Sequence, residues 1–586
     1  MKMQNQSSSI KHISSSKLKT IRRRFASLYG IEQTDLLMDR FYHLIGRYGI
    51  GAQKNAPRNT LTQRDALLIT YADMVSEEGK HPLVTLREFC TARLKGAFSA
   101  IHILPFYPWT SDDGFSVVDY REVDERYGRW DDVARFSEEF ELMFDLVLNH
   151  CSVKSPWFKE YVSGIEPGRN YIMEVDEKAD LSAVVRPRST PLLTTFQTRG
   201  GERSVWTTFG SDQVDLDWTS PDLLFEFFDV IMFYVSMGCR ILRLDAVAFL
   251  WKKIGTSCLH LPETHEVVKL IRNLLEVVAP EVLILTETNV PHEENVSYFG
   301  KGDEAHAVYQ FTLPPLLLHG LLRGTAKHLS SWASQLSPPP RGCHFLNFTA
   351  SHDGIGVRPL EGILPKQEIL DLAEEVEKKG GFVSMRKLED GSESPYELNS
   401  TYYSALADPN DESLGEARFL CSQSVALAMR GIPAVYFHSI CATSNDLKGV
   451  KETGRNRTIN RKKWEGAELE KLLEEKEGQA LRVFEWYTRI LRRRAACPVF
   501  HPDAPQEILD FGTSIFALER VSLDGDQVVL CLFNFQGKDT EVPESERLRA
   551  LFLNGKARDL ISGAEIVFQE GEFALRPYQA LWLSSH

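Results

Sequence analysis

The sequence has no run of about 18 apolar residues, so no transmembrane helix is expected. Its nine cysteines are scattered, without a Cys-x-x-Cys pair or a Cys/His set spaced like a metal site. An odd number of cysteines without a framework is typical of reduced thiols, which predicts a cytoplasmic protein with no metal or other cofactor. Residues 1–24 are basic and serine-rich, and they lack the apolar core of a secretory signal.

Positive charge is also in short supply. The 67 Lys and Arg are outnumbered by 81 Asp and Glu, which gives a formal net charge of −14. Nucleic acids and anionic membranes repel such a protein, so neither is expected as a partner. Hydrophobic residues make up 43% of the chain and charged residues 25%, as in an ordinary globular protein with a large buried core.

Short apolar runs alternate with longer helical stretches over most of the chain. This alternation is typical of a parallel sheet whose strands are joined by helices. The apolar character of each run is continuous, which fits strands buried on both faces. Eight runs are predicted, and they imply a closed (β/α)8 barrel: Leu67–Ala72, Ala100–Pro105, Leu142–Leu148, Arg240–Ala246, Val282–Thr286, Ala307–Phe311, Phe345–Ala350 and Ile432–Phe437.

Two connections, residues 151–217 after the third predicted strand and residues 354–404 after the seventh, are too long for simple barrel loops. Loops of this length usually carry function. The second of them contains a charged helix over Lys366–Lys379, followed by turns rich in Gly, Ser and Pro. The predicted parts are a disordered tail (1–15), a helical extension (16–62), the first part of the barrel (63–150), an inserted subdomain (151–217), the second part of the barrel (218–353), a second insertion (354–404), the end of the barrel (405–505) and a C-terminal antiparallel β domain (506–586).

Polar side chains end four of the eight predicted strands. One such residue alone is more often a helix cap or part of a structural ion pair. Together they would converge on one mouth, because catalytic groups of this barrel lie at the C-terminal strand ends. Two of them, Arg243 and Asp245, stand two residues apart and so point to one face of their strand. The full set is Asn149, His150, Arg243, Asp245, Glu287, His352 and Asp353.

The four strand ends also resemble a known family. The segments DLVLNH, ILRLDAVAF, ILTETN and FTASHD are similar, in this order, to the four signature regions of glycoside hydrolase family 13, the α-amylase superfamily. The resemblance implies Asp245 as nucleophile, Glu287 as general acid/base and Asp353 as stabiliser of the transition state. Two successive displacements would retain the anomeric configuration, which requires the carboxyl groups of Asp245 and Glu287 to lie about 5–5.5 Å apart.

The same resemblance implies that His150 and His352 bind hydroxyl groups of the sugar and that Arg243 orients the nucleophile. Physical chemistry agrees with these roles. The guanidinium of Arg243 is expected to lower the pKa of Asp245 and keep it ionised. Glu287 follows an apolar run, where burial would raise its pKa and keep it protonated for the leaving group.

Arginines in two predicted mouth loops favour a phosphorylase over a hydrolase. They lie at Arg186–Arg188 in the first insertion and at Arg455–Arg461 after the eighth strand. Such arginines are often solvated surface charge, but two sets facing one mouth would bind a phosphate dianion. Further segments resemble the sucrose phosphorylase subfamily, and most closely its glucosylglycerate phosphorylase branch: SDDGF, RPRSTPLLT, QVDLDW, GTSCLHLPETH, ETNVPHEEN, PYELNSTYYSAL and NRTINR.

This closer resemblance implies further binding residues. They are Asp112 and Phe115 at the glucosyl ring, with Arg188, Tyr396 and Arg457 at the acceptor. Arg186 is an alternative to Arg188. Glu397 stands where sucrose phosphorylases carry a glutamine that faces fructose. Glu397 and the helical extension, which typical sucrose phosphorylases lack, both favour glucosylglycerate over sucrose.

The sequence therefore predicts a retaining α-glucoside phosphorylase, a hexosyltransferase that moves a glucosyl unit from glucosylglycerate to inorganic phosphate and gives glucose 1-phosphate. Sucrose phosphorylase is the main alternative; enzymes for glucosylglycerol or sucrose phosphate stay open, and a plain hydrolase is less favoured. Barrel subunits of membrane transporters in this family lack the carboxylates, which disfavours that class. Some relatives dimerise, so a homodimer is one assembly open to the chain.

Overall fold

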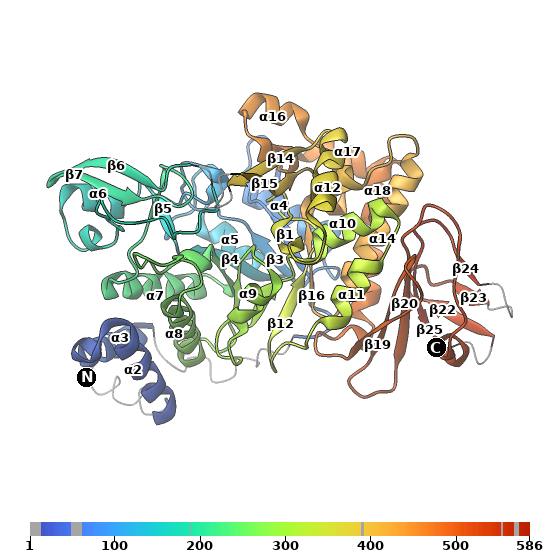
Figure 1. Ribbon diagram of the computed structural model, residues 1–586, viewed down its shortest axis with the longest axis horizontal. Helices are drawn as coiled ribbons and strands as arrows, with labels where there is room; N and C mark the ends of the chain where they lie inside the picture. Colours follow the sequence, from blue (N-terminus) through green and yellow to red (C-terminus); the bar gives the residue numbers. More distant parts are fainter. Residues whose placement is uncertain are drawn as a thin grey trace.

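The computed structural model describes residues 13–48, 61–188, 190–387, 392–551, 555–567 and 573–585. Eight parallel strands close into a barrel at the centre of the molecule (Figure 1). Each strand overlaps the run predicted for it, so the (β/α)8 barrel is confirmed. Around the barrel the strands are β1 (Leu67–Thr70), β16 (Ile432–Tyr436), β12 (His344–Asn347), β11 (Ala307–Tyr309), β10 (Leu283–Thr286), β9 (Cys239–Asp245), β4 (Glu141–Val147) and β3 (Ala100–Ile103).

Helices surround these strands and bury their outer faces. Every residue of β1 and β3 is buried, as the continuous apolar runs predict for strands covered on both sides. Within the described residues no helix is both long enough and apolar enough to span a bilayer. The larger helices of this layer are α4 (Pro82–Phe89), α5 (Trp130–Phe136), α7 (Pro221–Ser236), α8 (Pro262–Val278), α10 (Leu313–Arg323), α11 (Lys327–Gln335), α14 (Glu412–Ala428), α17 (Gly466–Glu474) and α18 (Gln479–Ala495).

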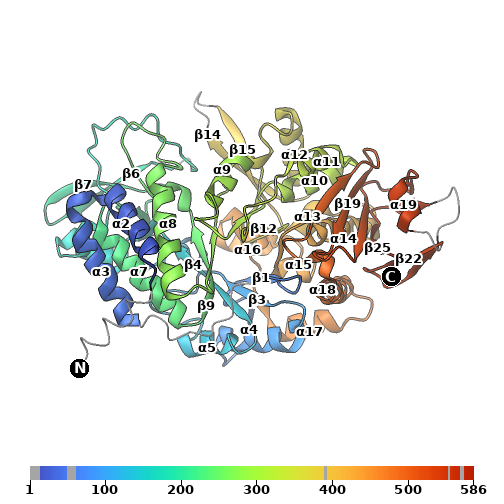
Figure 2. The same cartoon turned by 90° about the horizontal axis from the view of Figure 1, so that it is seen from below.

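The amino-terminal extension forms two antiparallel helices, α2 (Ser15–Tyr29) and α3 (Thr34–Tyr48), which pack against α8 and α7 (Figure 2). Phe25 is fully buried and stacks on Phe225 of α7, with ring centroids 5.9 Å apart. Arg24 is 4% exposed, and its guanidinium lies 2.8 Å from Glu266 and 3.0 Å from Asp303. The predicted disordered tail lies almost wholly outside the described residues.

The first insertion follows β4 and lies over one side of the barrel mouth (Figure 1). Its strands pair antiparallel, β5 with β8 and β6 with β7. The pairing of β5 with β8 sets His150 opposite Asp215. The elements of this insertion are β5 (His150–Ser152), α6 (Pro156–Ser163), β6 (Leu193–Thr198), β7 (Gly201–Trp206) and β8 (Gln213–Asp215).

The second insertion contains the predicted charged helix as α12 (Lys366–Lys378). The turn region predicted after it is instead largely a hairpin of β14 (Phe382–Lys387) and β15 (Glu393–Asn399). β15 shows no regular polar/apolar alternation, and the neighbouring residues are rich in Gly and Ser, so the sequence gave little signal for a strand here. β15 also pairs with β13 (Ile355–Gly356), which carries Tyr396 and Glu397 to the barrel mouth.

The carboxy-terminal part is a six-stranded antiparallel sheet, as predicted. Two fully buried arginines, Arg494 of α18 and Arg520 of β19, lie where this sheet meets the barrel. Within the described part of the chain, their guanidinium groups donate only to backbone carbonyls, including Leu427 O (2.9 Å) for Arg494 and Ala428 O (2.7 Å) for Arg520. The strands are β18 (Gln506–Leu509), β19 (Ile515–Val521), β20 (Val528–Asn534), β25 (Ala580–Ser584), β22 (Lys556–Asp559) and β23 (Glu565–Val567), accompanied by α19 (Glu546–Leu551).

Candidate active site

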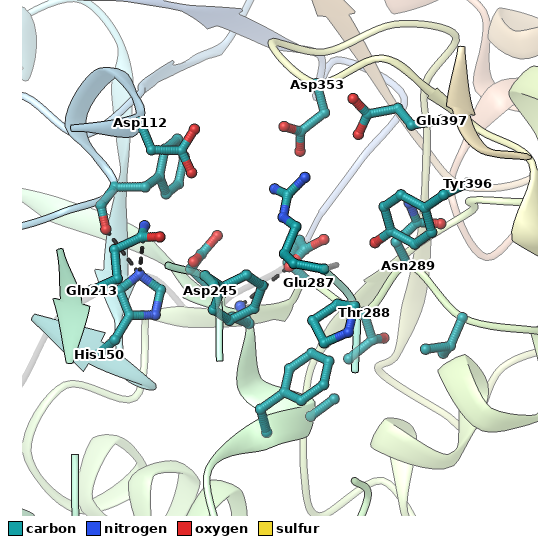
Figure 3. A pocket seen from close by; sticks show the side chains of 18 of the residues that line it. Asp112, His150, Gln213, Asp245, Glu287, Thr288, Asn289, Asp353, Tyr396 and Glu397 are labelled. Carbon is teal, nitrogen blue, oxygen red and sulfur yellow. Dashed lines mark hydrogen bonds between the residues drawn. The ribbon is translucent and has the colours of Figure 1, made fainter. Parts of the chain in front are cut away.

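A pocket with an empty volume of about 780 Å³ opens at the C-terminal ends of the barrel strands. The candidates named from the sequence line it, except Asn149 and Arg243, which are buried outside the lining, and Arg186, the alternative to Arg188. The polar groups of the pocket face one another across a shared space (Figure 3). The candidates in the lining are Asp112, Phe115, His150, Arg188, Asp245, Glu287, His352, Asp353, Tyr396, Glu397 and Arg457.

Asp245 and Glu287 lie at the ends of neighbouring strands of the barrel. β9 and β10 pair with Leu244 opposite Thr286, so the two carboxylates end adjacent strands. A carboxylate oxygen of Glu287 accepts a hydrogen bond from the backbone N–H of Ala246 at 3.2 Å. Arg243 Nη1 lies 2.7 Å from Asp245 Oδ1. Arg243 is therefore placed to orient Asp245, whereas the expected carboxyl separation of about 5–5.5 Å stays a prediction.

Burial dominates the ionisation of this carboxylate pair. It raises the pKa of Glu287, as expected, and it raises the pKa of Asp245 well above its ordinary value although Arg243 opposes the shift. The expectation of a lowered pKa at Asp245 is therefore wrong in its net direction. Of the two, only Asp245 forms an ion pair with an arginine among the described residues, and this contact favours the charged form of Asp245.

Asp353 faces the same pocket and is held by arginines. Arg457 Nη1 lies 2.7 Å from Asp353 Oδ1, while Nε and Nη2 of Arg457 donate to the two oxygens of Glu397 at 3.0 and 2.7 Å. Arg461 Nη2 lies 3.6 Å from Asp353 Oδ1. Burial opposes ionisation of Asp353, but the arginines hold the pKa of Asp353 far below its usual range. Arg457 is thus engaged by two carboxylates, unlike the free phosphate-binding cation expected from the sequence.

One side of the pocket, the predicted glucosyl side, is built by the loop after β3. Gly114 (φ 114°) lets this loop pass close to Pro105, because a Cβ at Gly114 would lie 2.5 Å from the Pro105 carbonyl oxygen. Phe115 then stacks on the His352 ring, with centroids 4.8 Å apart and planes 8° apart. Burial lowers the pKa of His352 to about 3, so its ring is neutral at pH 7 and able to hydrogen-bond to hydroxyl groups.

His150 lies across the pocket from the acceptor-side residues (Figure 3). Its Nε2 is 3.0 Å from the Phe115 carbonyl oxygen and 3.2 Å from Gln213 Nε2. Burial lowers the pKa of His150, which leaves this ring neutral as well. Gln213 lines the pocket, although the sequence gave no reason to select it beyond its place in the segment QVDLDW.

The opposite side of the pocket carries Asn289, Tyr396 and Glu397 (Figure 3). Asn289 packs against Gly356 of β13, where a Cβ would lie 2.5 Å from Asn289 Nδ2. Burial raises the pKa of Tyr396, and nearby Arg188 opposes that shift. Arg188 and Tyr396 line the same pocket, and the place of Arg188 at the acceptor stays a prediction.

Several pocket residues were missed from the sequence. Asn289 stands two positions after Glu287, so its place behind a strand end was a usable signal. Arg358 gave none, because its position depends on the fold of the second insertion. Lys252, also missed, lies outside the lining and is buried 2.7 Å from Asp215, the residue opposite His150. Among the described residues, no three His, Cys, Asp or Glu side chains are grouped to hold a metal ion.

Comparisons with known proteins agree with this geometry. Residues 95–329 match the family model described as alpha amylase, catalytic domain. A glucosylglycerate phosphorylase of Spirochaeta thermophila is 46% identical over 538 residues, covering 90% of this chain and 91% of that protein. The glucosylglycerate phosphorylase of Allomeiothermus silvanus is 45% identical, covering 89% of this chain and 91% of its own. The chain belongs to the glucosylglycerate phosphorylase family, within glycoside hydrolase family 13.

A solved structure supports the same placement at lower identity. The crystal structure of sucrose 6F-phosphate phosphorylase from Thermoanaerobacter thermosaccharolyticum superposes with a TM-score of 0.71 and 26% identity, covering 83% of this chain and 95% of that one. Together these relatives confirm the predicted fold and the predicted class, an enzyme of the phosphorylase type. The retained carboxylates agree with that class.

Proposed function

We propose that this enzyme is a retaining α-glucoside phosphorylase that transfers a glucosyl unit from glucosylglycerate to inorganic phosphate. The products are α-glucose 1-phosphate and glycerate. Two observations bear on the substrate: the names of the relatives at 45–46% identity, and a pocket whose acceptor side carries cations. The roles of individual residues below are part of the same proposal.

In the first half-reaction the carboxylate of Asp245 attacks the anomeric carbon. The bond from that carbon to the glycerate oxygen breaks, and Glu287 gives its proton to the leaving oxygen. Arg243 keeps Asp245 aligned, while Asp353 faces the ring where positive charge develops. His150 and His352, both neutral, hydrogen-bond to the glucosyl hydroxyls.

In the second half-reaction phosphate replaces glycerate on the acceptor side. Glu287, now ionised, takes a proton from the incoming phosphate as a phosphate oxygen attacks the anomeric carbon. The ester bond to Asp245 breaks, which frees its carboxylate. Two inversions retain the α configuration. Arginines on this side favour the anionic acceptor over water.

One observation carries the proposal. The same pocket joins a carboxylate pair on adjacent strand ends to two arginines, Arg188 and Arg358, that are not neutralised at hydrogen-bond distance by a carboxylate among the described residues. A hydrolase of neutral glucosides needs the carboxylate pair but has no anion for these cations to bind. A phosphorylase needs both, because its acceptor is a dianion.

A screen of four α-glucosides tests the proposal. Purified enzyme is given glucosylglycerate, sucrose, glucosylglycerol or sucrose 6F-phosphate, each with and without phosphate, and glucose 1-phosphate and free glucose are measured. We expect rapid, phosphate-dependent release of glucose 1-phosphate from glucosylglycerate alone. Equal release of free glucose without phosphate would identify a hydrolase instead. A preference for another donor would make that donor, and not glucosylglycerate, the substrate.

Location and assembly belong to this proposal as well. The proposal places the enzyme in the cytoplasm and leaves the homodimer open as one assembly of the chain. Light scattering after size-exclusion chromatography at micromolar concentration distinguishes a homodimer from a monomer.

A further inference from the structure

Arg358 is a charged pocket residue that lies outside the sequence motifs. It follows β13, and the backbone N–H of Val357 donates to Tyr396 O at 3.0 Å. That hydrogen bond fixes the backbone of this loop beside β15. The side chain of Arg358 is 16% exposed and lines the pocket together with Asn289 and Tyr396. Arg358 therefore stands on the acceptor side, next to the segment that begins with Glu287.

The guanidinium of Arg358 has capacity for an anion. Arg457 donates to Glu397 and contacts Asp353, so its charge is balanced within the pocket. Arg358 has one long contact, 3.8 Å from Nη2 to Glu294 Oε2, and its buried Nε has no hydrogen-bond partner among the described residues. A buried donor without a partner is unfavourable, and an acceptor oxygen in the pocket would satisfy it.

A second set of contacts holds Arg358 in place. Glu294 Oε2 lies 3.2 Å from His260 Nε2, and His260 Nδ1 lies 2.9 Å from the Tyr298 hydroxyl. Burial lowers the pKa of His260 to about 4, so its ring is neutral at pH 7. Because His260 is neutral, it does not compensate the negative charge of Glu294. This charge therefore attracts the guanidinium of Arg358 and helps to fix its position, although the two groups form no close ion pair.

We propose that Arg358 recognises the carboxylate of the leaving acid and thereby selects a glucoside of an anionic hydroxy acid over that of the corresponding neutral alcohol. This inference rests on the proposed function, because it assigns the residue that reads the acceptor. A planar carboxylate matches the guanidinium fork, so one or two N–H groups bind its oxygens. The carboxylate carbon is bonded to the carbon that bears the glycosidic oxygen, which places it near Glu287.

The test compares two donors that differ only in this carboxylate. Phosphorolysis of glucosylglycerate and of neutral glucosylglycerol is measured at saturating phosphate for the wild type, Arg358→Ala, Arg358→Gln and Arg358→Lys. Arg386→Ala is the matched control, because Arg386 belongs to the same insertion, pairs with Glu361 and does not line the pocket. Thermal unfolding of each variant is recorded alongside, and Arg358→Gln keeps much of the side-chain volume if the alanine variant folds poorly.

Arg358→Ala and Arg358→Gln should lower the ratio of kcat/KM for glucosylglycerate to kcat/KM for glucosylglycerol by about tenfold or more, the effect of one charge-assisted hydrogen bond. Arg358→Lys should restore part of the ratio, and Arg386→Ala should leave it unchanged. An unchanged ratio in folded Arg358 variants would overturn the inference. A raised KM for phosphate with both donors equally slowed would assign Arg358 to phosphate instead. If the wild type itself releases no glucose 1-phosphate from glucosylglycerate, the proposed function fails, and this inference fails with it.

Discussion

The two sides of the pocket are built in different ways. On the glucosyl side, most charged groups are already paired with one another, as Asp353 is with Arg457 and Arg461. On the acceptor side, Arg188 and Arg358 have no carboxylate partner at hydrogen-bond distance among the described residues. The first side is preorganised for one sugar. The second keeps cations without a close carboxylate partner, as the proposed exchange of glycerate for phosphate requires.

The largest effect is expected from replacing the proposed nucleophile, Asp245, which lies between the two sides of the pocket. Asp245→Asn should lower kcat/KM by roughly ten-thousandfold or more, because an amide does not attack the anomeric carbon. Thermal unfolding should change little, since asparagine keeps the size and still accepts a hydrogen bond from Arg243. Glucose 1-phosphate release and a melting curve measure both quantities. Near-wild-type turnover would remove Asp245 from its role.

Glu287→Gln should lower phosphorolysis by about 10²- to 10⁴-fold through loss of proton transfer. The pH profile sharpens this test. Burial raises the pKa of Glu287, and the first step needs the protonated form, so wild-type kcat/KM should fall as pH rises through that raised pKa. This alkaline decline should disappear in the variant. Its persistence would show that another group supplies the proton.

Arg457→Ala tests whether Arg457 serves to balance the charges of two carboxylates or to bind the acceptor. Removal of Arg457 leaves Glu397, which is 1% exposed, and Asp353 without their main cation. We expect a loss of about 3 kcal/mol in unfolding free energy. We also expect about a hundredfold slower turnover, with phosphorolysis and hydrolysis falling together. If phosphorolysis alone falls while hydrolysis is kept, Arg457 acts on the acceptor, as the sequence suggested.

The smallest expected effect on turnover lies far from both sides. Arg24→Ala removes the polar contacts of this side chain with α8, including the 2.8 Å ion pair with Glu266. Its partners are partly exposed, so the unfolding free energy should fall by roughly 1–2 kcal/mol. The kcat/KM for phosphorolysis should stay at the wild-type value. A loss of activity at full stability would connect the extension to the site.

The barrel and its strand-end residues were predictable because they depend on local patterns. A continuous apolar run followed by a polar residue marks a buried strand and its catalytic end, as in the segment that ends at Glu287. The same reasoning placed Arg243 beside Asp245, two residues away on one face. Such features are set within a few residues and by the parallel register of neighbouring strands.

The remaining features depend on contacts between distant segments. The partners of Arg457 come from β15 and from the loop after β12, and no spacing in the sequence brings these together. The pKa of Asp245 follows from burial by the whole pocket, which outweighs its one neighbouring arginine. Arg358 reaches the acceptor side only because β13 pairs with β15. Loop-borne residues therefore needed the folded chain.

Arg494 and Arg520 affect how the molecule unfolds. Each guanidinium gathers carbonyl groups from segments far apart in sequence, at the seam between barrel and C-terminal sheet. If the C-terminal sheet separated from the barrel, the two guanidinium groups would lose their hydrogen-bond acceptors at an apolar interface, and the carbonyl groups would lose their donors. The seam therefore ties both parts into one cooperative melting unit. A calorimetric scan should show a single transition, and the isolated sheet should fail to fold.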